Sequence, residues 1–183
     1  MTEIAGKLIA ILATSGFEQS ELEVPRKRLK EAGLDVDIVA PEAGKIRGWK
    51  GTDWGDEVAV DKTLEEADPA DYDALVLPGG VINPDQLRTK PEAVSFIQQV
   101  HGAGKPVAAI CHGPWLLVEA DLLRGRRATS YPSIRTDVEN AGAQWSDEEV
   151  VADGGLITSR KPDDLDAFCD ALLDALEQAT KAA

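Results

Sequence analysis

Residues 106–114 read Pro-Val-Ala-Ala-Ile-Cys-His-Gly-Pro, and this stretch decides the fold. The run from Val107 to Ile110 is small and apolar throughout, as expected for a strand that is buried on both faces of a parallel sheet. A helix is expected directly after it, through Glu119. Cys111 therefore stands at a tight strand-to-helix turn, with a small residue two positions away on each side. This spacing indicates a nucleophile elbow in which Cys replaces Ser.

The alternation of strand and helix continues in both directions from this stretch. Buried strands are expected at 7–14, 36–40, 73–77 and 106–110, shorter strands at 45–50, 58–60 and 127–130, and a hairpin at 150–159. Helices are expected at 18–32, 91–103, 114–119, 133–141 and 162–181. This order predicts a mainly parallel α/β sheet with helices on both faces, whose functional site lies at the carboxyl ends of the strands.

Three of the predicted strand ends carry residues suited to chemistry. Glu18 follows the first strand, Gly79-Gly80 follows a middle one, and Cys111-His112 follows a later one. A helix N-terminus favours the thiolate, so Cys111 is a candidate nucleophile and His112 a candidate general base. The alternatives are a Cys111 buried in the core, a His112 ring that points away from it, and a first-turn helix carboxylate at Glu18.

The other cysteine and histidine fit structural positions. Cys169 lies on the apolar stripe of the last predicted helix, and His101 lies in the last turn of a helix, where it can meet free carbonyls. Two separated histidines and two separated cysteines do not form a zinc ligand set. Residues 78–80, Pro-Gly-Gly, lack the pattern of a phosphate-binding loop. No metal and no cofactor are therefore expected.

Length and charge narrow the function further. The chain has 183 residues, and we expect one domain spanning 1–183. It carries 33 Asp and Glu against 19 Lys and Arg, a formal net charge of −14, so no nucleic acid binding and no attraction to an anionic membrane are expected. Two cysteines in unlike contexts, no signal peptide and no apolar run of membrane-spanning length predict a cytoplasmic protein.

The chain resembles the PfpI family of intracellular proteases and protein deglycases, within the ThiJ/PfpI superfamily. The resemblance rests on Gly16-Phe17-Glu18 with Glu21-Leu22, on residues 73–80 ending in Leu-Pro-Gly-Gly, on residues 104–114, on Thr129-Ser130-Tyr131-Pro132, and on residues 158–165. These stretches span residues 7–178 in the family's order. The resemblance implies a flavodoxin-like three-layer α/β/α sandwich of the class I glutamine-amidotransferase-like group.

The resemblance also implies roles for the residues at the strand ends. Cys111 would be the nucleophile and Glu18 would contact its sulfur, so we expect a raised pKa for Glu18. The backbone N–H groups of Gly80 and His112 would form an oxyanion hole beside Gly79.

Two further roles come from the same resemblance. Tyr131 would line the site. His112 would be the base, oriented by an acid that the family usually supplies as a Glu just after the Gly-Gly pair of a neighbouring subunit. Asp85 stands near that place here and is one methylene shorter. The resemblance implies a homodimer or a larger homo-oligomer.

Three functions remain open. The first is a stress-protective hydrolase of the deglycase or glyoxalase type, in which Cys111 adds to a small carbonyl such as methylglyoxal or to a glycated protein adduct. The second is an intracellular cysteine peptidase that forms an acyl-enzyme on a peptide substrate. The third is a holdase or redox sensor without turnover, in which Cys111 is oxidised reversibly.

Overall fold

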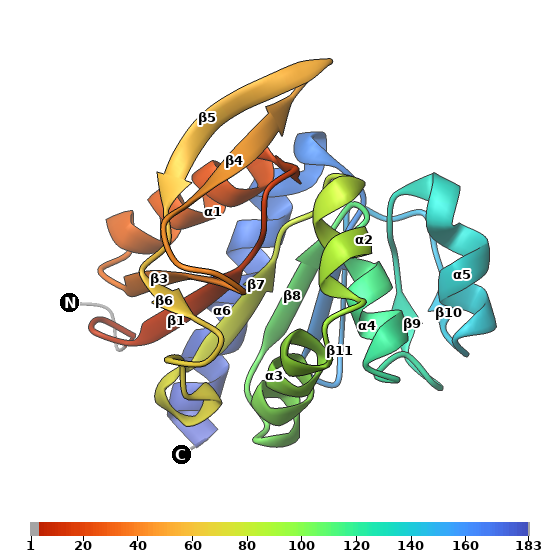
Figure 1. Cartoon of the computed structure of the whole chain (residues 1–183). Coiled ribbons are helices and arrows are strands. Elements are labelled where there is room, and N and C mark those ends of the chain that lie inside the picture. The colour runs from red at the N-terminus through yellow and green to blue at the C-terminus, as the bar shows by residue number, and fades with distance from the viewer. Residues whose placement is uncertain (1–3, 183) are drawn as a thin grey trace.

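The computed structural model describes residues 4–182 and contains a seven-stranded sheet at its centre (Figure 1). The strand order is β11-β12-β8-β7-β1-β3-β6, and only the pairing of β11 with β12 is antiparallel. The strands are β1 (Leu8–Leu12), β3 (Asp35–Ala40), β6 (Lys62–Thr63), β7 (Ala74–Leu77), β8 (Val107–Ile110), β11 (Val150–Asp153) and β12 (Leu156–Ser159). The predicted α/β class, the parallel sheet and the C-terminal hairpin are confirmed.

Helices cover both faces of the sheet, which makes three layers. On one face α1 (Gln19–Glu31) packs beside α6 (Leu165–Ala182); the other face is covered by α3 (Pro91–Gly102), α4 (Pro114–Glu119) and α5 (Arg135–Asn140). Side chains of β1 alternate between the two cores: Ile9 and Ile11 join the first, Ala10 and Leu12 the second. All four are fully buried, which explains why the strand reads as a continuous apolar run.

The largest departure from the expected elements lies between β3 and β7. A strand was expected only at 58–60, but β5 (Asp53–Ala59) is a full strand that pairs with β4 (Lys45–Lys50). The pair projects from the sheet as an arm (Figure 1), and β2 (Phe17–Glu18) pairs with Gly48 and Trp49 in the second half of β4. Only Val58 of β5 is buried, so the strand lacks the alternating apolar pattern that predicts one.

Short elements complete the chain. α2 (Ile82–Leu87), which follows β7, was not predicted, because Pro84 stands inside a helix of only six residues. A two-stranded sheet joins β9 (Arg127–Ala128) to β10 (Gln144–Trp145), and single 3-10 turns are η1 (Pro69–Asp71), η2 (Pro132–Ile134) and η3 (Pro162–Asp164). In the part of the chain that the structure describes, no helix is both long and apolar enough to cross a membrane.

Candidate active site

Cys111 occupies a strained turn between β8 and α4. Its φ angle is +64°, in the left-handed region that a side chain other than Gly rarely adopts, at a cost of roughly 1–2 kcal/mol. Neighbouring strands hold it there, because its N–H donates to the Ser159 carbonyl at 3.0 Å and its carbonyl accepts from the Tyr131 N–H at 2.8 Å. A Cβ on Gly113 would lie 2.6 Å from the Leu77 carbonyl oxygen, so this position needs glycine. Cys111 therefore stands at a tight, strained turn between a buried strand and a helix.

The carboxyl group that meets the Cys111 thiol is Glu21, which corrects the expectation for Glu18. Glu21 is fully buried, its Oε2 accepts a hydrogen bond from the Gly79 N–H at 2.8 Å, and its carboxyl hydrogen-bonds the thiol. Glu18 is half-buried at the N-cap of α1 and accepts a hydrogen bond from the Ser20 hydroxyl. Glu18 therefore lies one helical turn before the residue that forms the contact.

Glu21 and Cys111 share a proton-binding site. Burial raises the pKa of Glu21 from 4.5 to about 8, and the charge of nearby Glu18 adds to this. Burial also raises the pKa of Cys111, and an ionised Glu21 would raise it further. Two adjacent buried groups cannot both be ionised at low cost, so they titrate as a pair. At neutral pH Glu21 is mostly protonated and can donate its proton toward the sulfur.

Backbone N–H groups oppose the effect of burial on the thiol. Hydrogen bonds from the N–H groups of Gly80 and His112 to the sulfur lower the pKa of Cys111. Gly80 has φ +74°, and a Cβ on Gly79 would lie 2.6 Å from both the Glu21 carboxyl and the Ile110 carbonyl oxygen. The two glycines thus let the β7 turn approach the elbow closely. The backbone N–H groups of Gly80 and His112 thus both face the Cys111 sulfur.

His112 contacts the thiol with one ring nitrogen and a hydroxyl with the other. Its Nδ1 lies 3.2 Å from the Cys111 sulfur, and its Nε2 lies 3.1 Å from the Ser133 hydroxyl oxygen. Burial lowers the pKa of His112, which favours the neutral ring. If Ser133 accepts a hydrogen bond from Nε2–H, then Nδ1 is left free to accept the thiol proton. His112 therefore points toward the nucleophile rather than away from it.

Aromatic rings cover His112. Tyr131 stacks on it at 4.8 Å between ring centroids, and Trp115 meets it edge-on at 5.1 Å. Trp115 is fixed by a 2.8 Å hydrogen bond from its indole N–H to Asp137. Tyr131 thus lies beside His112, and the two rings restrict the imidazole to one orientation.

Asp85 does not orient His112 within the described chain. It lies in the first turn of α2 with an exposed side chain, and Ser133 occupies the position next to Nε2 where an acid was expected. The buried residue of this turn is Asn83, whose side-chain N–H groups donate to the Pro78 carbonyl at 2.9 Å and the Gly79 carbonyl at 3.2 Å. Asn83 thus holds the glycine turn against the elbow.

Sequence reasoning missed Glu21, Asn83 and Ser133 as site residues. For Glu21 a signal exists: Glu21, Pro25 and Leu29 follow one another at four-residue spacing, and all three lie on the buried face of α1. A charged residue on the apolar face of a helix marks a group that burial will perturb. Asn83 and Ser133 carry no such signal, because only tertiary packing brings them to the site.

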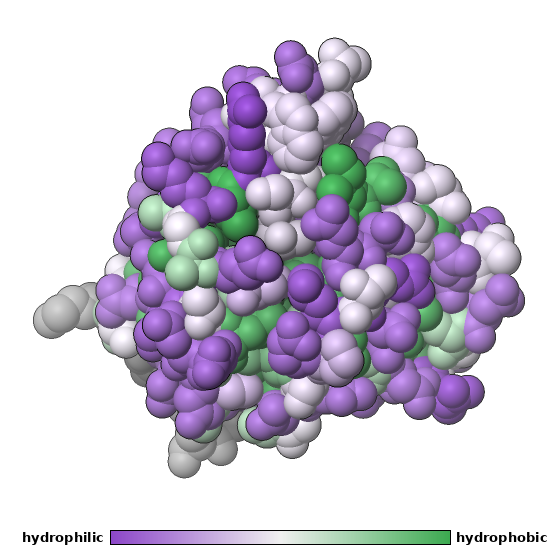
Figure 2. All heavy atoms as spheres, in the orientation of Figure 1, coloured by the Kyte–Doolittle hydropathy of each residue, from purple (hydrophilic) through white to green (hydrophobic). Residues whose placement is uncertain are grey.

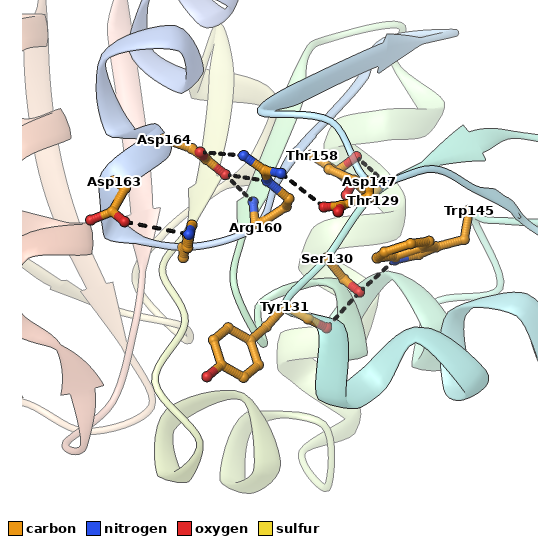
Figure 3. A network of polar contacts seen from close by, with 10 residues as sticks. Thr129, Ser130, Tyr131, Trp145, Asp147, Thr158, Arg160, Asp163 and Asp164 are labelled. Atoms are coloured by element: carbon orange, nitrogen blue, oxygen red, sulfur yellow. Dashed lines mark hydrogen bonds and ion pairs between the residues drawn. The ribbon is translucent and has the colours of Figure 1, made fainter.

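A pocket of about 300 Å³ adjoins the site through Tyr131. It is lined by Tyr131, Pro132, Asp147, Arg160 and Lys161. Figure 3 shows the polar network beside it, in which Asp164 and Asp147 approach the Arg160 guanidinium from opposite sides.

The other predicted structural residues lie away from the thiol. Cys169 on α6 is 1% exposed and belongs to the hydrophobic core. His101 Nε2 lies 3.3 Å from the Gly154 carbonyl oxygen. Both cysteines are free.

Comparison with known proteins agrees with this architecture. The model of the DJ-1/PfpI family matches residues 7–175. The chain therefore belongs to the DJ-1/PfpI family. It is 48% identical over 164 residues to protein/nucleic acid deglycase 2 of Escherichia coli (88% of this chain, 93% of the relative). It is 47% identical over 175 residues to general stress protein 18 of Bacillus subtilis (94% and 99%).

A solved structure of a DJ-1/PfpI family member confirms the fold. A two-domain protein from Anabaena variabilis, with DJ-1/ThiJ/PfpI-like and ferritin-like domains, superposes with a TM-score of 0.88 and 43% identity. The match covers 93% of this chain and 48% of the Anabaena chain, so this chain spans about half of that protein. The flavodoxin-like sandwich implied by the PfpI resemblance is thereby confirmed.

Proposed function

We propose that this DJ-1/PfpI protein is a cysteine-dependent enzyme that acts on reactive carbonyls or on glycated adducts. The observation that carries the proposal is the Cys111–Glu21 pair, in which a buried carboxyl of raised pKa hydrogen-bonds a strained nucleophile. Such a carboxyl is a proton donor at neutral pH, as addition of sulfur to a carbonyl requires. The deglycase and stress-protein names of the relatives support the same chemistry.

The reaction with methylglyoxal illustrates the proposed steps. The Cys111 sulfur bonds to the aldehyde carbon, and the carbonyl oxygen takes up a proton to give a hemithioacetal. A proton then leaves the former aldehyde carbon and another is added at the neighbouring ketone carbon, so the first carbon is oxidised and the second reduced. Water hydrolyses the resulting thioester, which releases lactate and the thiol. The balance is methylglyoxal plus water to lactate, with no external oxidant.

The described side chains divide these proton transfers between them. Glu21 donates to the carbonyl oxygen and takes the proton back, since it gains and loses a proton at about pH 8. His112 accepts the thiol proton at Nδ1, and Ser133 holds the ring. The N–H groups of Gly80 and His112 stabilise the oxyanion formed on addition.

The chain's assembly and location form part of the same proposal. We infer a single cytoplasmic domain that forms a homodimer or a larger homo-oligomer. Val81 is 54% exposed and Trp54 42% exposed, and Figure 2 includes a hydrophobic group of side chains over the start of α2. A second copy that covers this region would lie near Asp85, which gives that carboxylate a route to a neighbouring His112.

Peptide hydrolysis is the second candidate, since the elbow and the paired N–H donors also suit an acyl-enzyme. The buried protonated Glu21 favours carbonyl addition, because a peptidase needs no carboxyl beside its thiolate. A holdase or redox sensor is the third. A redox sensor would use the thiol without turnover, whereas the activity of a holdase would survive loss of the thiol.

Lactate release from methylglyoxal tests the proposal. The wild type should form lactate, and Cys111→Ser should form none. If a wild type whose Cys111 is reduced and alkylatable releases no lactate, the carbonyl proposal is wrong. Hydrolysis of a peptide library would then support the peptidase, whereas suppression of aggregation by both wild type and Cys111→Ser would support the holdase.

A further inference from the structure

The pocket beside Tyr131 has no role in the proton transfers proposed above. Its volume is about 300 Å³, and its lining includes two cationic side chains, Arg160 and Lys161. Tyr131 is shared between the two sites, because its ring also stacks on His112 at 4.8 Å. Arg160 directly follows Ser159, whose carbonyl oxygen accepts the Cys111 N–H bond. The pocket is therefore linked to the thiol through Tyr131 and through the end of β12.

One side of the Arg160 guanidinium is fixed. Its Nε and Nη2 donate to the two carboxylate oxygens of Asp164, each at 2.9 Å, and the backbone N–H of Arg160 donates to the same carboxylate. The side chain of Asp164 is 3% exposed. This fork-to-fork pair is buried and geometrically matched, so it holds the guanidinium in one orientation.

The other side of the guanidinium carries a replaceable partner. Nη1 donates to Asp147 Oδ1 at 2.8 Å, and the Asp147 side chain is 66% exposed (Figure 3). Among the described residues, Asp147 forms no other hydrogen bond or ion pair in the structure. Exposed ion pairs contribute little to stability, so exchanging this carboxylate for another one costs little.

We propose that the pocket binds a carboxylate group of the substrate, which takes the place of Asp147 on Nη1 of Arg160, with Lys161 beside it. The group that Nη1 already binds is the Asp147 carboxylate, so the same donor suits a carboxylate of the substrate. The inference rests on the proposed function for the reacting part of the substrate. It adds to that function a preference for substrates that carry a free carboxylate within reach of Arg160 Nη1.

Because the protein as a whole is strongly acidic, binding of an anionic substrate depends on the two cations that line the pocket. With a net charge of −14, the whole protein does not attract anions, so any preference for an anionic substrate must come from Arg160 and Lys161 themselves. Lys161 is 45% exposed, and its ion pair is with Asp163, which is 81% exposed. The second cation is thus also held only by an exposed partner.

A pair of thiol reagents tests the pocket without relying on turnover. N-(2-carboxyethyl)maleimide and its carboxamide differ only in the carboxylate, and both add to Cys111. Mass spectrometry of the Cys111 peptide gives the labelling rate of each reagent, and the rate of the acid is divided by that of the amide. This acid-to-amide ratio, divided by the same ratio for free N-acetylcysteine, should exceed one in the wild type. Asp147→Ala should raise this ratio about fivefold, because it removes the competing carboxylate.

Two control variants separate this effect from a general change of charge. Asp121→Ala removes an exposed aspartate that pairs with Arg124 away from the pocket, and Glu148→Ala removes an exposed acid next to Asp147. Both should leave the ratio within about 1.5-fold of the wild type. A wild-type ratio at or below one, or a rise in Glu148→Ala equal to that in Asp147→Ala, would overturn the proposal.

A turnover arm separates failure of the pocket from failure of the proposed function. The hemithioacetals of methylglyoxal with N-acetylcysteine and with its amide again differ by one carboxylate. Asp147→Ala should raise kcat/KM for the acid relative to the amide about fivefold. No lactate from either, together with the expected labelling ratios, would reject the carbonyl chemistry and keep the carboxylate pocket. Turnover of both with equal kcat/KM in wild type and Asp147→Ala would reject the pocket and keep the chemistry.

Discussion

The two cysteines of the chain lie in regions that look alike by burial and differ in everything else. Cys111 at the β8–α4 turn is 7% exposed, and Cys169 in the second turn of α6 is 1% exposed. Burial raises the pKa of both, that of Cys169 to about 11. Cys169 lies inside a regular helix and packs in the core, whereas Cys111 has a φ of +64°.

The difference between the two regions teaches that burial alone does not identify a nucleophile. What sets Cys111 apart is the set of groups aimed at its sulfur: two backbone N–H donors, the His112 ring and the protonated Glu21. Around Cys169 the neighbours are apolar, with the charge of Arg28 as the main opposing influence on its pKa.

Removing each thiol should give the largest contrast. Cys111→Ser should lower kcat/KM for methylglyoxal by about 10³-fold or more, because the serine hydroxyl stays protonated at neutral pH and is a far poorer nucleophile than sulfur. Cys169→Ala should keep activity within about twofold and cost roughly 1 kcal/mol of stability. Lactate assays and urea unfolding measure the two effects. Loss of activity in Cys169→Ala with an unchanged fold would show that Cys169 is not merely a structural residue.

Replacing the two glutamates should distinguish the proton donor from its neighbour. Glu21→Gln keeps the shape and an acceptor for the Gly79 N–H but cannot transfer a proton, so kcat should fall about 10²-fold. Glu18→Gln should fall less than about threefold, because this residue acts on Glu21 only through its charge. Steady-state kinetics at pH 7 checks both, and equal losses would restore Glu18 to the role first expected of it.

Glu21 should also make stability depend on pH. The folded protein holds the Glu21 proton up to about pH 8, whereas the unfolded chain releases it near pH 4.5, so stability falls as pH rises through this window. At pH 7 the loss should be roughly 3 kcal/mol relative to acid pH. Urea unfolding should show this loss in the wild type and in Glu18→Gln but not in Glu21→Gln. A wild-type curve parallel to that of Glu21→Gln would contradict the raised pKa.

The Ser133 hydroxyl should have an intermediate effect. Ser133→Ala removes the partner of His112 Nε2 and frees the ring tautomer, so kcat should fall about tenfold with little change in KM. Ser133→Thr should restore most of the activity, because it keeps the hydroxyl. The control Ser95→Ala removes an exposed helix serine that bonds Gln99 and should have no effect. An unchanged pH–rate profile in Ser133→Ala would argue against a positioning role.

Replacing Asp85 should have the smallest effect on activity if the active site of each chain is complete without a second copy. Its exposed carboxylate has no contact with His112 within the described chain, so Asp85→Ala should stay within about twofold of the wild type. A loss of tenfold or more, accompanied by activity that rises with protein concentration, would indicate that a second copy supplies Asp85. Kinetics over a dilution series distinguishes the two cases.

Much of the fold follows from local patterns in the sequence. Apolar runs such as Ile9–Ala13 mark strands buried on both faces, and the stripe that includes Phe168 and Leu172 marks α6. The arm strand β5 could not be found this way, because only Val58 is buried there and its pairing with β4 rests on backbone bonds. Hydrophobic periodicity reports burial, so it misses elements that bury little.

The candidate site likewise contains residues that local sequence patterns identify and residues that only packing brings together. Cys111, His112, Gly79 and Gly80 could be identified from sequence, because a tight turn between a buried strand and a helix needs small residues around its nucleophile. The family resemblance and the position of Glu18 after a strand end favour Glu18 over Glu21. In the structure Glu18 is the N-cap of α1 with extended backbone angles, whereas Glu21 lies inside the helix on its buried face. Which glutamate faces the sulfur therefore depends on where α1 begins and on how it packs against the sheet.

The sequence by itself determined the α/β order, the elbow and the glycine turns, since each depends on residues that are neighbours along the chain. Only the tertiary structure decided that Glu21 shares a proton with Cys111, that Ser133 meets His112, and that Arg160 presents one donor to a pocket beside Tyr131. These contacts join residues on different elements: Glu21 lies on α1 and Cys111 at the end of β8, and 21 positions separate His112 from Ser133. Burial, charge and hydrogen-bond direction act across space, so they are fixed only when the layers pack.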